Sequence, residues 1–180
     1  MTYPGTALLR RAARLMALAV ALCMAPAARA DDYAQVTQLL RSGKLAQALA
    51  QADQYLAAKP KDPQMRFLKG VVQSEDGRAN DAIETFTRLT EDYPELAEPY
   101  NNLAVLHAAG GQLDKARTAL EAAVRANPGY AIAHENLGDV YARMATASYG
   151  RAQQFDPTSK SLPAKLTLIR QLLPSARGGG

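Results

Sequence analysis

The two histidines of the chain, His107 and His134, are the side chains best suited to bind a metal or to act as a base near neutral pH. A metal site needs at least a third ligand, and none is spaced with either histidine. Glu135 follows His134 directly, and adjacent residues point to different sides of a helix. The pattern therefore favours two partly buried structural histidines, with a small metal-binding protein that uses both of them as the alternative.

Other reactive groups are equally scarce in this sequence. The glycines are spread along the chain rather than gathered in a phosphate-binding loop, and no Gly-x-Ser-x-Gly elbow is present. The single cysteine, Cys23, follows the bulky Leu22, whereas a small residue usually precedes a lipidated cysteine. We therefore expect no catalytic residue, no metal and no cofactor, and the chain is predicted to be a non-enzyme.

The segment 1–30 has the pattern of a secretory signal peptide. Three arginines between positions 10 and 14 precede an uncharged stretch, and Ala28-Arg29-Ala30 fits the small-x-small cleavage rule before Asp31. The uncharged stretch, residues 15–28, is shorter than the roughly 20 apolar residues of a membrane-spanning helix. We therefore expect cleavage after Ala30, loss of Cys23 with the leader, no stable membrane insertion and a location in a bacterial periplasm.

Charge is balanced once this leader is set aside. The chain has 21 Lys and Arg against 17 Asp and Glu, and four of the basic residues lie in the segment 1–30. A nucleic-acid binder needs a concentrated positive surface, so the composition does not support this class of protein. The remaining length is that of one domain of ordinary size.

A period of about 34 residues, the length of one helix–turn–helix repeat, organises the rest of the sequence. Residues of three types recur at this period, namely Gly43, Gly77 and Gly111, Ala48, Ala82 and Ala116, and Pro60, Pro94 and Pro128. Apolar residues between these markers follow helical spacing, so each period is a pair of helices joined at the glycine and ended by the proline. The alanine lets two helix backbones approach closely. The predicted helices are 32–41, 45–58, 64–75, 79–92, 98–109 and 113–126.

The periods also share a pattern of large and small residues at other positions, namely Gly70, Phe86, Tyr100, Leu103, Leu120, Gly138, Tyr141 and Pro157. On these residues the chain resembles tetratricopeptide-repeat (TPR) proteins of the exported bacterial type, from about Asp31 to Pro157. The resemblance implies an all-α TPR solenoid with three regular helix pairs and a shortened fourth unit. Its units would be 31–60, which matches most weakly, 61–94, 95–128 and 129–157.

The fourth unit departs from the period because part of it is missing. The stretch from Gly138 to Pro157 is shorter, by more than one turn of helix, than the matching stretch from Gly70 to Pro94 in the second unit. We predict that the two helices of the fourth unit are fused into one helix over 131–155. Two short helices with a turn near Ala145 are the alternative.

The segment 158–173 follows the repeats and is predicted to cap them. An amphipathic helix over 162–173 would place Leu162, Leu166, Ile169 and Leu173 on one face. A stack of helix pairs exposes an apolar face at its end, and this helix would cover it. The tail 174–180 has little apolar surface to bury and is expected to be disordered.

The resemblance also implies where a partner would bind. In TPR proteins the first helix of each unit lines a concave surface that holds an extended peptide or a helix of a partner. The residues of this chain at the matching positions are Tyr33, Thr37, Gln64, Phe67, Val71, Ser74, Glu98, Asn101, Val105, Ala108, Glu135 and Asp139. For Phe67, Val71 and Val105 the alternative is burial between helices. Asn102 and Asn136 are expected to bond backbone groups within the stack.

These positions predict the chemistry of the ligand. TPR domains that grip a free C-terminal carboxylate use Lys and Asn there, and this chain has no Lys at the matching positions. The surface would be apolar toward the first two units and acidic at Glu98, Glu135 and Asp139. It would suit a protein segment with apolar anchors and a basic end.

The predicted function is a non-enzymatic scaffold or adaptor that docks such a segment and assists the assembly or maturation of an envelope protein. The alternative from a different class is a structural building block. Such a chain would self-associate through the exposed end face of its last unit, and the sequence leaves the oligomeric state open.

Overall fold

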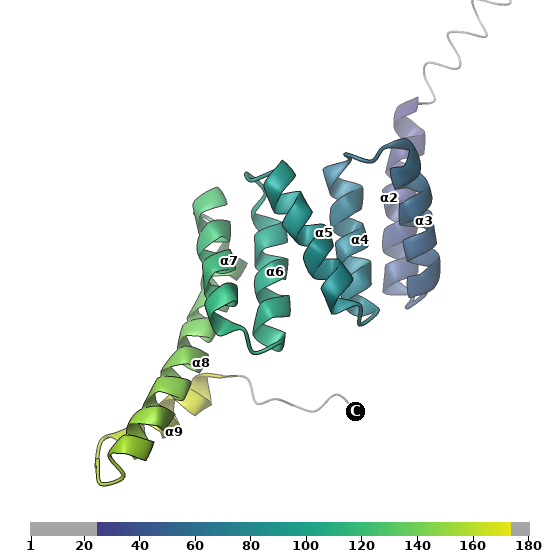
Figure 1. The fold of residues 1–180 in the computed structure, drawn as a ribbon. Helices are drawn as coiled ribbons and strands as arrows, with labels where there is room; N and C mark the ends of the chain where they lie inside the picture. The colour runs from purple at the N-terminus through teal and green to yellow at the C-terminus, as the bar shows by residue number, and fades with distance from the viewer. Residues whose placement is uncertain (1–24, 174–180) are drawn as a thin grey trace, which may run out of the picture. The chain divides into compact units, whose positions relative to one another are not determined.

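The computed structural model describes residues 25–173. Residues 1–24, which are most of the predicted signal peptide, and the tail 174–180, for which disorder is predicted, lie outside the described residues. Within this range the regular secondary structure is α-helix, without strands, as predicted (Figure 1). The helices are α2 (Ala25–Arg41), α3 (Leu45–Ala58), α4 (Pro63–Glu75), α5 (Ala79–Asp92), α6 (Ala97–Ala109), α7 (Leu113–Ala126), α8 (Ala131–Phe155) and α9 (Leu162–Leu172).

The helix boundaries agree with the sequence prediction except at a few ends. α4 and α6 each begin one residue earlier than predicted, and α9 ends at Leu172 rather than 173. The larger difference is α2, which begins at Ala25 instead of residue 32. Its added turns are rich in alanine and carry Pro26 near the start, where proline is tolerated in a helix. The predicted cleavage site therefore lies inside this helix.

The turn within each helix pair depends on a glycine with a left-handed backbone. The φ angles are 71° at Gly43, 75° at Gly77 and 72° at Gly111, and no other residue type has a positive φ in the described chain. An L side chain at such an angle would clash with its own carbonyl group, so glycine is the favoured residue. The periodic glycines are thus explained by backbone geometry, as the sequence predicted.

The periodic alanines are buried at the fourth residue of the second helix of each pair. Ala48, Ala82 and Ala116 all have 0% of their surface exposed. The prolines Pro60, Pro94 and Pro128 each follow the second helix in a short turn, also as predicted. Buried alanines without a larger side chain allow the helix backbones to pack closely.

The chain divides into two compact units, residues 1–68 and 69–180, and the boundary falls within α4. In the first unit Val36, Ala52 and Met65 form a core with no exposed surface. Beside this core Asp62 joins three helices. Its carboxylate accepts hydrogen bonds from the Tyr33 hydroxyl on α2 (2.6 Å), the Tyr55 hydroxyl on α3 (3.0 Å) and the backbone N–H of Met65 in the first turn of α4 (3.0 Å).

In the second unit, the packing of α4 on α5 requires a glycine at position 70. A Cβ atom placed on Gly70 would lie 2.6 Å from the ring of Phe86, which is fully buried. The position two periods later, Gly138 on α8, has no atom within 4 Å of a corresponding Cβ. The reason is that the fourth unit has no separate second helix to pack against it.

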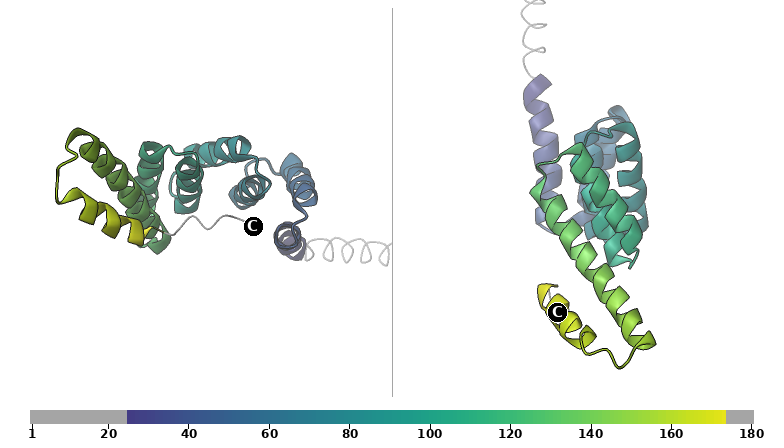
Figure 2. Two further views of the ribbon diagram at one scale, coloured as in Figure 1. Left: turned by 90° about the horizontal axis from the view of Figure 1, so that it is seen from below. Right: turned by 90° about the vertical axis from the view of Figure 1, so that its left-hand side faces the viewer.

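The fourth unit is one continuous helix, so the fused form of the prediction is confirmed. α8 packs on α6 and α7 through Ala133 and Val140, and its second half runs on beyond them (Figures 1 and 2). α9 returns along this second half and buries Leu162 and Leu166. No helix among the described residues is both long and apolar enough to span a membrane.

Gly70→Ala should lower the free energy of unfolding by about 1–3 kcal/mol, because the new methyl group overlaps the Phe86 ring. Gly138→Ala is the matched control. It should leave stability unchanged or raise it by up to about 1 kcal/mol, since the site is open and alanine favours a helix. Urea denaturation followed by circular dichroism measures both. Equal effects of the two variants would contradict this account of the packing.

Asp62→Asn should destabilise the protein at pH 7 by about 1–3 kcal/mol, and the difference from wild type should shrink in acid. Burial raises the pKa of Asp62, but hydrogen bonds from Tyr33, the Met65 amide, Tyr55 and the Gln64 amide outweigh it and lower this pKa below its ordinary value of 3.8. The charged form is therefore favoured in the folded state. Its stabilisation is present above pH 3.8 and is lost as the pH falls through the lowered pKa.

Urea titrations of wild type and variant at pH 7 and near pH 3 test this prediction. Tyr33→Phe is the companion variant, because it keeps the carboxylate and removes one of its donors. It should show a smaller loss at pH 7 with the same dependence on pH. A loss that is constant across pH would show that the charge of Asp62 is not what stabilises the junction.

Candidate functional site

The structure places the two histidines in separate local roles. His107 lies half-buried near the end of α6, with its Nδ1 3.0 Å from Oε1 of Gln112. His134 is exposed on α8, with its Nε2 3.0 Å from the backbone oxygen of Pro128. The expectation of partial burial is therefore wrong for His134, because its ring reaches back over the short loop before α8. Among the described residues, no group of three or more His, Cys, Asp or Glu could hold a metal ion.

The predicted partner residues of the first unit are largely committed to the fold. The Tyr33 hydroxyl donates to Asp62 and lies 2.9 Å from that of Tyr55, and the Thr37 hydroxyl donates to the backbone oxygen of Tyr33 (2.7 Å). Burial raises the pKa of Tyr33, and the hydrogen bond from its hydroxyl to the Asp62 carboxylate raises this pKa further. Gln64 is exposed, and Phe67 is half-buried. The Tyr33 hydroxyl is thus part of the helix junction rather than a free group for a ligand.

In the second unit, α6 and α8 bring most of their predicted partner residues to one surface. Glu98 and Glu135 are exposed, Val105 is 51% exposed, and Asp139 is half-buried. The exposure of Val105 supports surface placement rather than burial between helices. Val71 and Ser74, on α4, are half-buried. Burial of Tyr130, just before α8, raises the pKa of this residue, and the negative charge of Glu98 on α6 raises it further.

The prediction that Asn101 faces this surface is wrong. It is only 7% exposed, and its Oδ1 accepts a hydrogen bond of 2.8 Å from Nδ2 of Asn136. This hydrogen bond joins α6 to α8, so Asn136 bonds a side chain rather than a backbone group. Asn102 does bond backbone, because its Nδ2 donates to the oxygen of Glu98 (2.9 Å).

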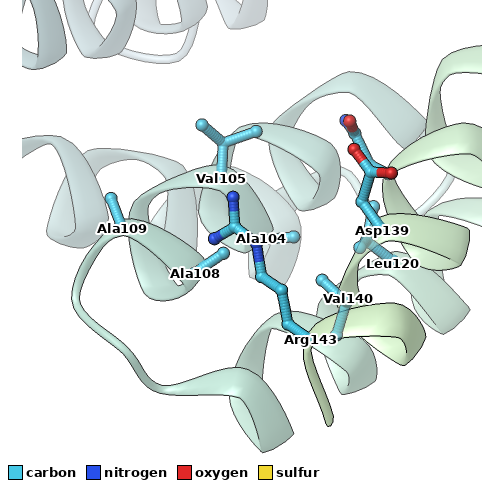
Figure 3. A pocket seen from close by; sticks show the side chains of 9 residues that line it. Ala104, Val105, Ala108, Ala109, Leu120, Asp139, Val140 and Arg143 are labelled. Atoms are coloured by element: carbon cyan, nitrogen blue, oxygen red, sulfur yellow. The ribbon is translucent and has the colours of Figure 1, made fainter. Parts of the chain in front are cut away.

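A pocket of about 230 Å³ opens between α6 and α8, with Leu120 of α7 among its lining residues (Figure 3). Its small apolar wall comes from Ala104, Ala108 and Val140. Pockets that bind a side chain are commonly apolar, with a few polar groups that fix its orientation.

Two charged side chains of α8 flank this pocket, and the sequence prediction found only Asp139. Arg143 extends from α8 across the pocket toward α6, while the Asp139 carboxylate points away from it (Figure 3). Within the described part of the chain neither group forms an ion pair or a hydrogen bond. Arg143 stands four residues after Asp139, and this helical spacing could have revealed it.

Ile132 is a second residue that the sequence prediction missed. It is 52% exposed, and Asp139 and Arg143 follow it about two and three helical turns later, so the three share one face of α8. We call the set Glu98, Val105, Ile132, Glu135, Asp139 and Arg143 the α6–α8 surface. Its exposed aliphatic side chains and unpaired charges could hold a protein segment by an apolar anchor and by ionic contacts.

Comparisons with known proteins agree with the repeat pattern. Two family models, both described as tetratricopeptide repeat, match residues 33–97 and 73–143. The chloroplast tetratricopeptide repeat domain-containing protein PYG7 of Arabidopsis thaliana is 32% identical over 100 residues, which are 53% of this chain and 29% of that protein. The chain therefore spans less than a third of the length of this relative.

Solved structures show the same fold. A thermophilic TPR protein of Thermus thermophilus matches with a TM-score of 0.58 and 24% identity, over 78% of this chain and 80% of that one. The Sgt2 TPR domain of Aspergillus fumigatus matches with a TM-score of 0.62 and 17% identity, over 66% of this chain and 80% of that one.

Proposed function

The chain belongs to the tetratricopeptide-repeat family, whose members act in protein–protein interaction, and on this premise we propose that it is a non-enzymatic scaffold of the bacterial periplasm. In this proposal it docks a peptide or a helix of a partner protein and assists the assembly or maturation of an envelope protein. Membership of the family supports a role in protein–protein interaction. The envelope partner and the periplasmic location are what we propose in addition.

The observation that carries this function is the α6–α8 surface. It combines a pocket of about 230 Å³ with two half-exposed aliphatic side chains, Val105 and Ile132. Interfaces obtain most of their binding energy from a few such anchors that become fully desolvated, and the charged groups around them set orientation. Glu98, Glu135 and Asp139 would receive the basic end of the segment.

The leader pattern supports the location. The arginines before an uncharged stretch and the Ala28-Arg29-Ala30 site are typical of export through a cleaved signal. Cleavage after Ala30 would remove the first turns of α2 and leave Tyr33, with its bond to Asp62, in the mature chain. The junction of the first three helices would therefore survive processing.

Processing can be checked on the protein made from the full sequence in a Gram-negative host. We expect the periplasmic fraction to contain a chain that begins at Asp31, as shown by its intact mass and its N-terminal peptide. Ala28→Leu combined with Ala30→Leu should block cleavage, because bulky residues do not fit the small-x-small rule. A chain of full mass that stays in the cytoplasm would contradict the proposed compartment.

Docking can be tested with a photo-crosslinking amino acid placed at Val105 or at Ile132. We expect each to capture a defined protein in intact cells, because both side chains lie on the α6–α8 surface. Lys115, which is exposed on α7, is the matched control position and should give no such adduct. Identification of the captured segment by mass spectrometry would give the partner.

The charges provide the second arm of this experiment. Glu135→Lys combined with Asp139→Lys should reduce the adduct at Val105 and weaken its dependence on salt, since both carboxylates would contact the basic end. Undiminished capture by this variant, or equal capture from Lys115, would argue against docking on this surface.

A further inference from the structure

The balance of charge outside the segment 1–30 hides a strong segregation. Residues 31–140 contain eleven Lys and Arg against sixteen Asp and Glu, whereas residues 141–173 contain five against one. The single acid of the later segment, Asp156, already accepts hydrogen bonds from the backbone N–H and the hydroxyl of Thr158 (3.1 and 2.8 Å). The repeats are thus acidic, and the second half of α8 together with α9 is basic.

The outer side of α9 carries apolar surface beside one of these cations. Leu168 is 64% exposed and Leu172 is 74% exposed, while Leu162 and Leu166 on the inner side are buried against α8. Lys165 precedes the two exposed leucines by three and seven residues, so the three form one stripe along the helix. Lys165 lies with its Nζ 5.4 Å from the ring centroid of Tyr149 on α8. A helix that docks in a groove is recognised by anchors at this spacing.

The α6–α8 surface has the complementary arrangement. Ile132 and Asp139 are seven residues apart on α8, which is also the separation of Leu172 and Lys165 on α9. Both separations correspond to about 10 Å along a helix axis. An antiparallel pair of helices would therefore place Leu172 against Ile132 and Lys165 against Asp139. Leu168 would then lie toward the pocket beside Val105.

We propose that the α6–α8 surface binds α9 of a second copy of this chain. The inference rests on the proposed function, namely that this surface docks a helix, and it names the occupant. The contact joins two different surfaces, so each copy keeps one free surface at either end. Such a heterologous contact continues head to tail into rings or filaments rather than stopping at a symmetric dimer.

An anionic lipid surface is the other occupant that a basic helix with exposed leucines could attract. Helices that lie in a membrane interface bury a broad apolar face, and many are about 20–30 residues long. α9 has 11 residues, and its main apolar side is already buried on α8. The narrow stripe that remains suits contact with one other helix. The three carboxylates of the α6–α8 surface, which outnumber its single cation Arg143, supply the opposite charge.

Analytical ultracentrifugation tests the proposal. The protein is purified from cells with the N-terminus that it has there, whether or not the leader has been removed. We expect the average mass to rise with concentration beyond that of a dimer, and the association to weaken from about 50 to about 300 mM salt. Leu168→Gln with Leu172→Gln, and separately Glu135→Lys with Asp139→Lys, should each weaken association about tenfold or more. The substituted leucines are exposed, so helical circular dichroism should be unchanged.

A mixture of these two variants gives the sharpest readout. Each lacks one of the two surfaces and retains the other, so together they should form a one-to-one dimer that grows no further. Lys165→Glu should weaken association, and Lys165→Glu combined with Asp139→Lys should restore it. Arg170→Glu is the matched control, because it makes the same charge change on the opposite flank of α9 and should have little effect.

Several results would overturn the inference. A wild-type protein that stays monomeric at millimolar concentration would do so. If the leucine variant lost association while the variant with Glu135→Lys and Asp139→Lys kept it, α9 would pair with itself, which would also overturn the inference. Binding to vesicles of equal phosphatidylglycerol and phosphatidylcholine that depends on Leu168 and Leu172, without self-association, would assign α9 to a membrane. A monomer whose Val105 position still captures a different protein would remove this inference and leave the proposed function standing.

Discussion

Close contact between helix backbones at small buried residues is the constraint on which the rest of the structure depends. Ala48, Ala82 and Ala116 have no exposed surface, and each is the fourth residue of the second helix of its pair. The left-handed glycine that precedes each of them sets the direction in which the second helix returns. Together they fix the relative positions of the helices within a pair. Surface residues, such as those on α6, can then vary without any change in the fold.

The shortened fourth unit shows what happens when this constraint is released. Without a second helix to return, α8 continues straight, and the glycine that a close neighbour requires at position 70 has open space around it at position 138. The added length of α8 provides a platform for α9, which covers it with Leu162 and Leu166. The same extension places Arg143 one turn beyond Asp139 at the pocket. The short fourth unit thus accounts both for the end of the repeats and for the position of Arg143 beside Asp139.

The sequence predicts local features well and distant partners poorly, for a physical reason. Helices, turns and the fusion over 131–155 follow from spacing and backbone preference within a few residues. The bond between Asn101 and Asn136 joins residues 35 positions apart, and the repeat pattern shows only that both are polar. The exposure of His134 likewise depends on what packs around its helix. Helical spacing from Asp139 predicts that Arg143 and Ile132 share its face of the helix. Both residues fall outside the positions that the family pattern assigns to the partner surface.

Outside the segment 1–30, a neutral net charge conceals two regions of opposite sign. The charge of each region, rather than the net charge, determines what binds there. Charges within about 8–10 Å of each other act on one another at physiological ionic strength, so a ligand responds to the local sum and not to the total. The α6–α8 surface presents Glu98, Glu135 and Asp139, whereas α9 presents Lys165 beside two exposed leucines. If one surface receives the α9 helix of another copy and also serves a different partner, the two ligands exclude each other. Self-association would then lower the apparent affinity for the partner in proportion to the local concentration of the chain, without any change in conformation.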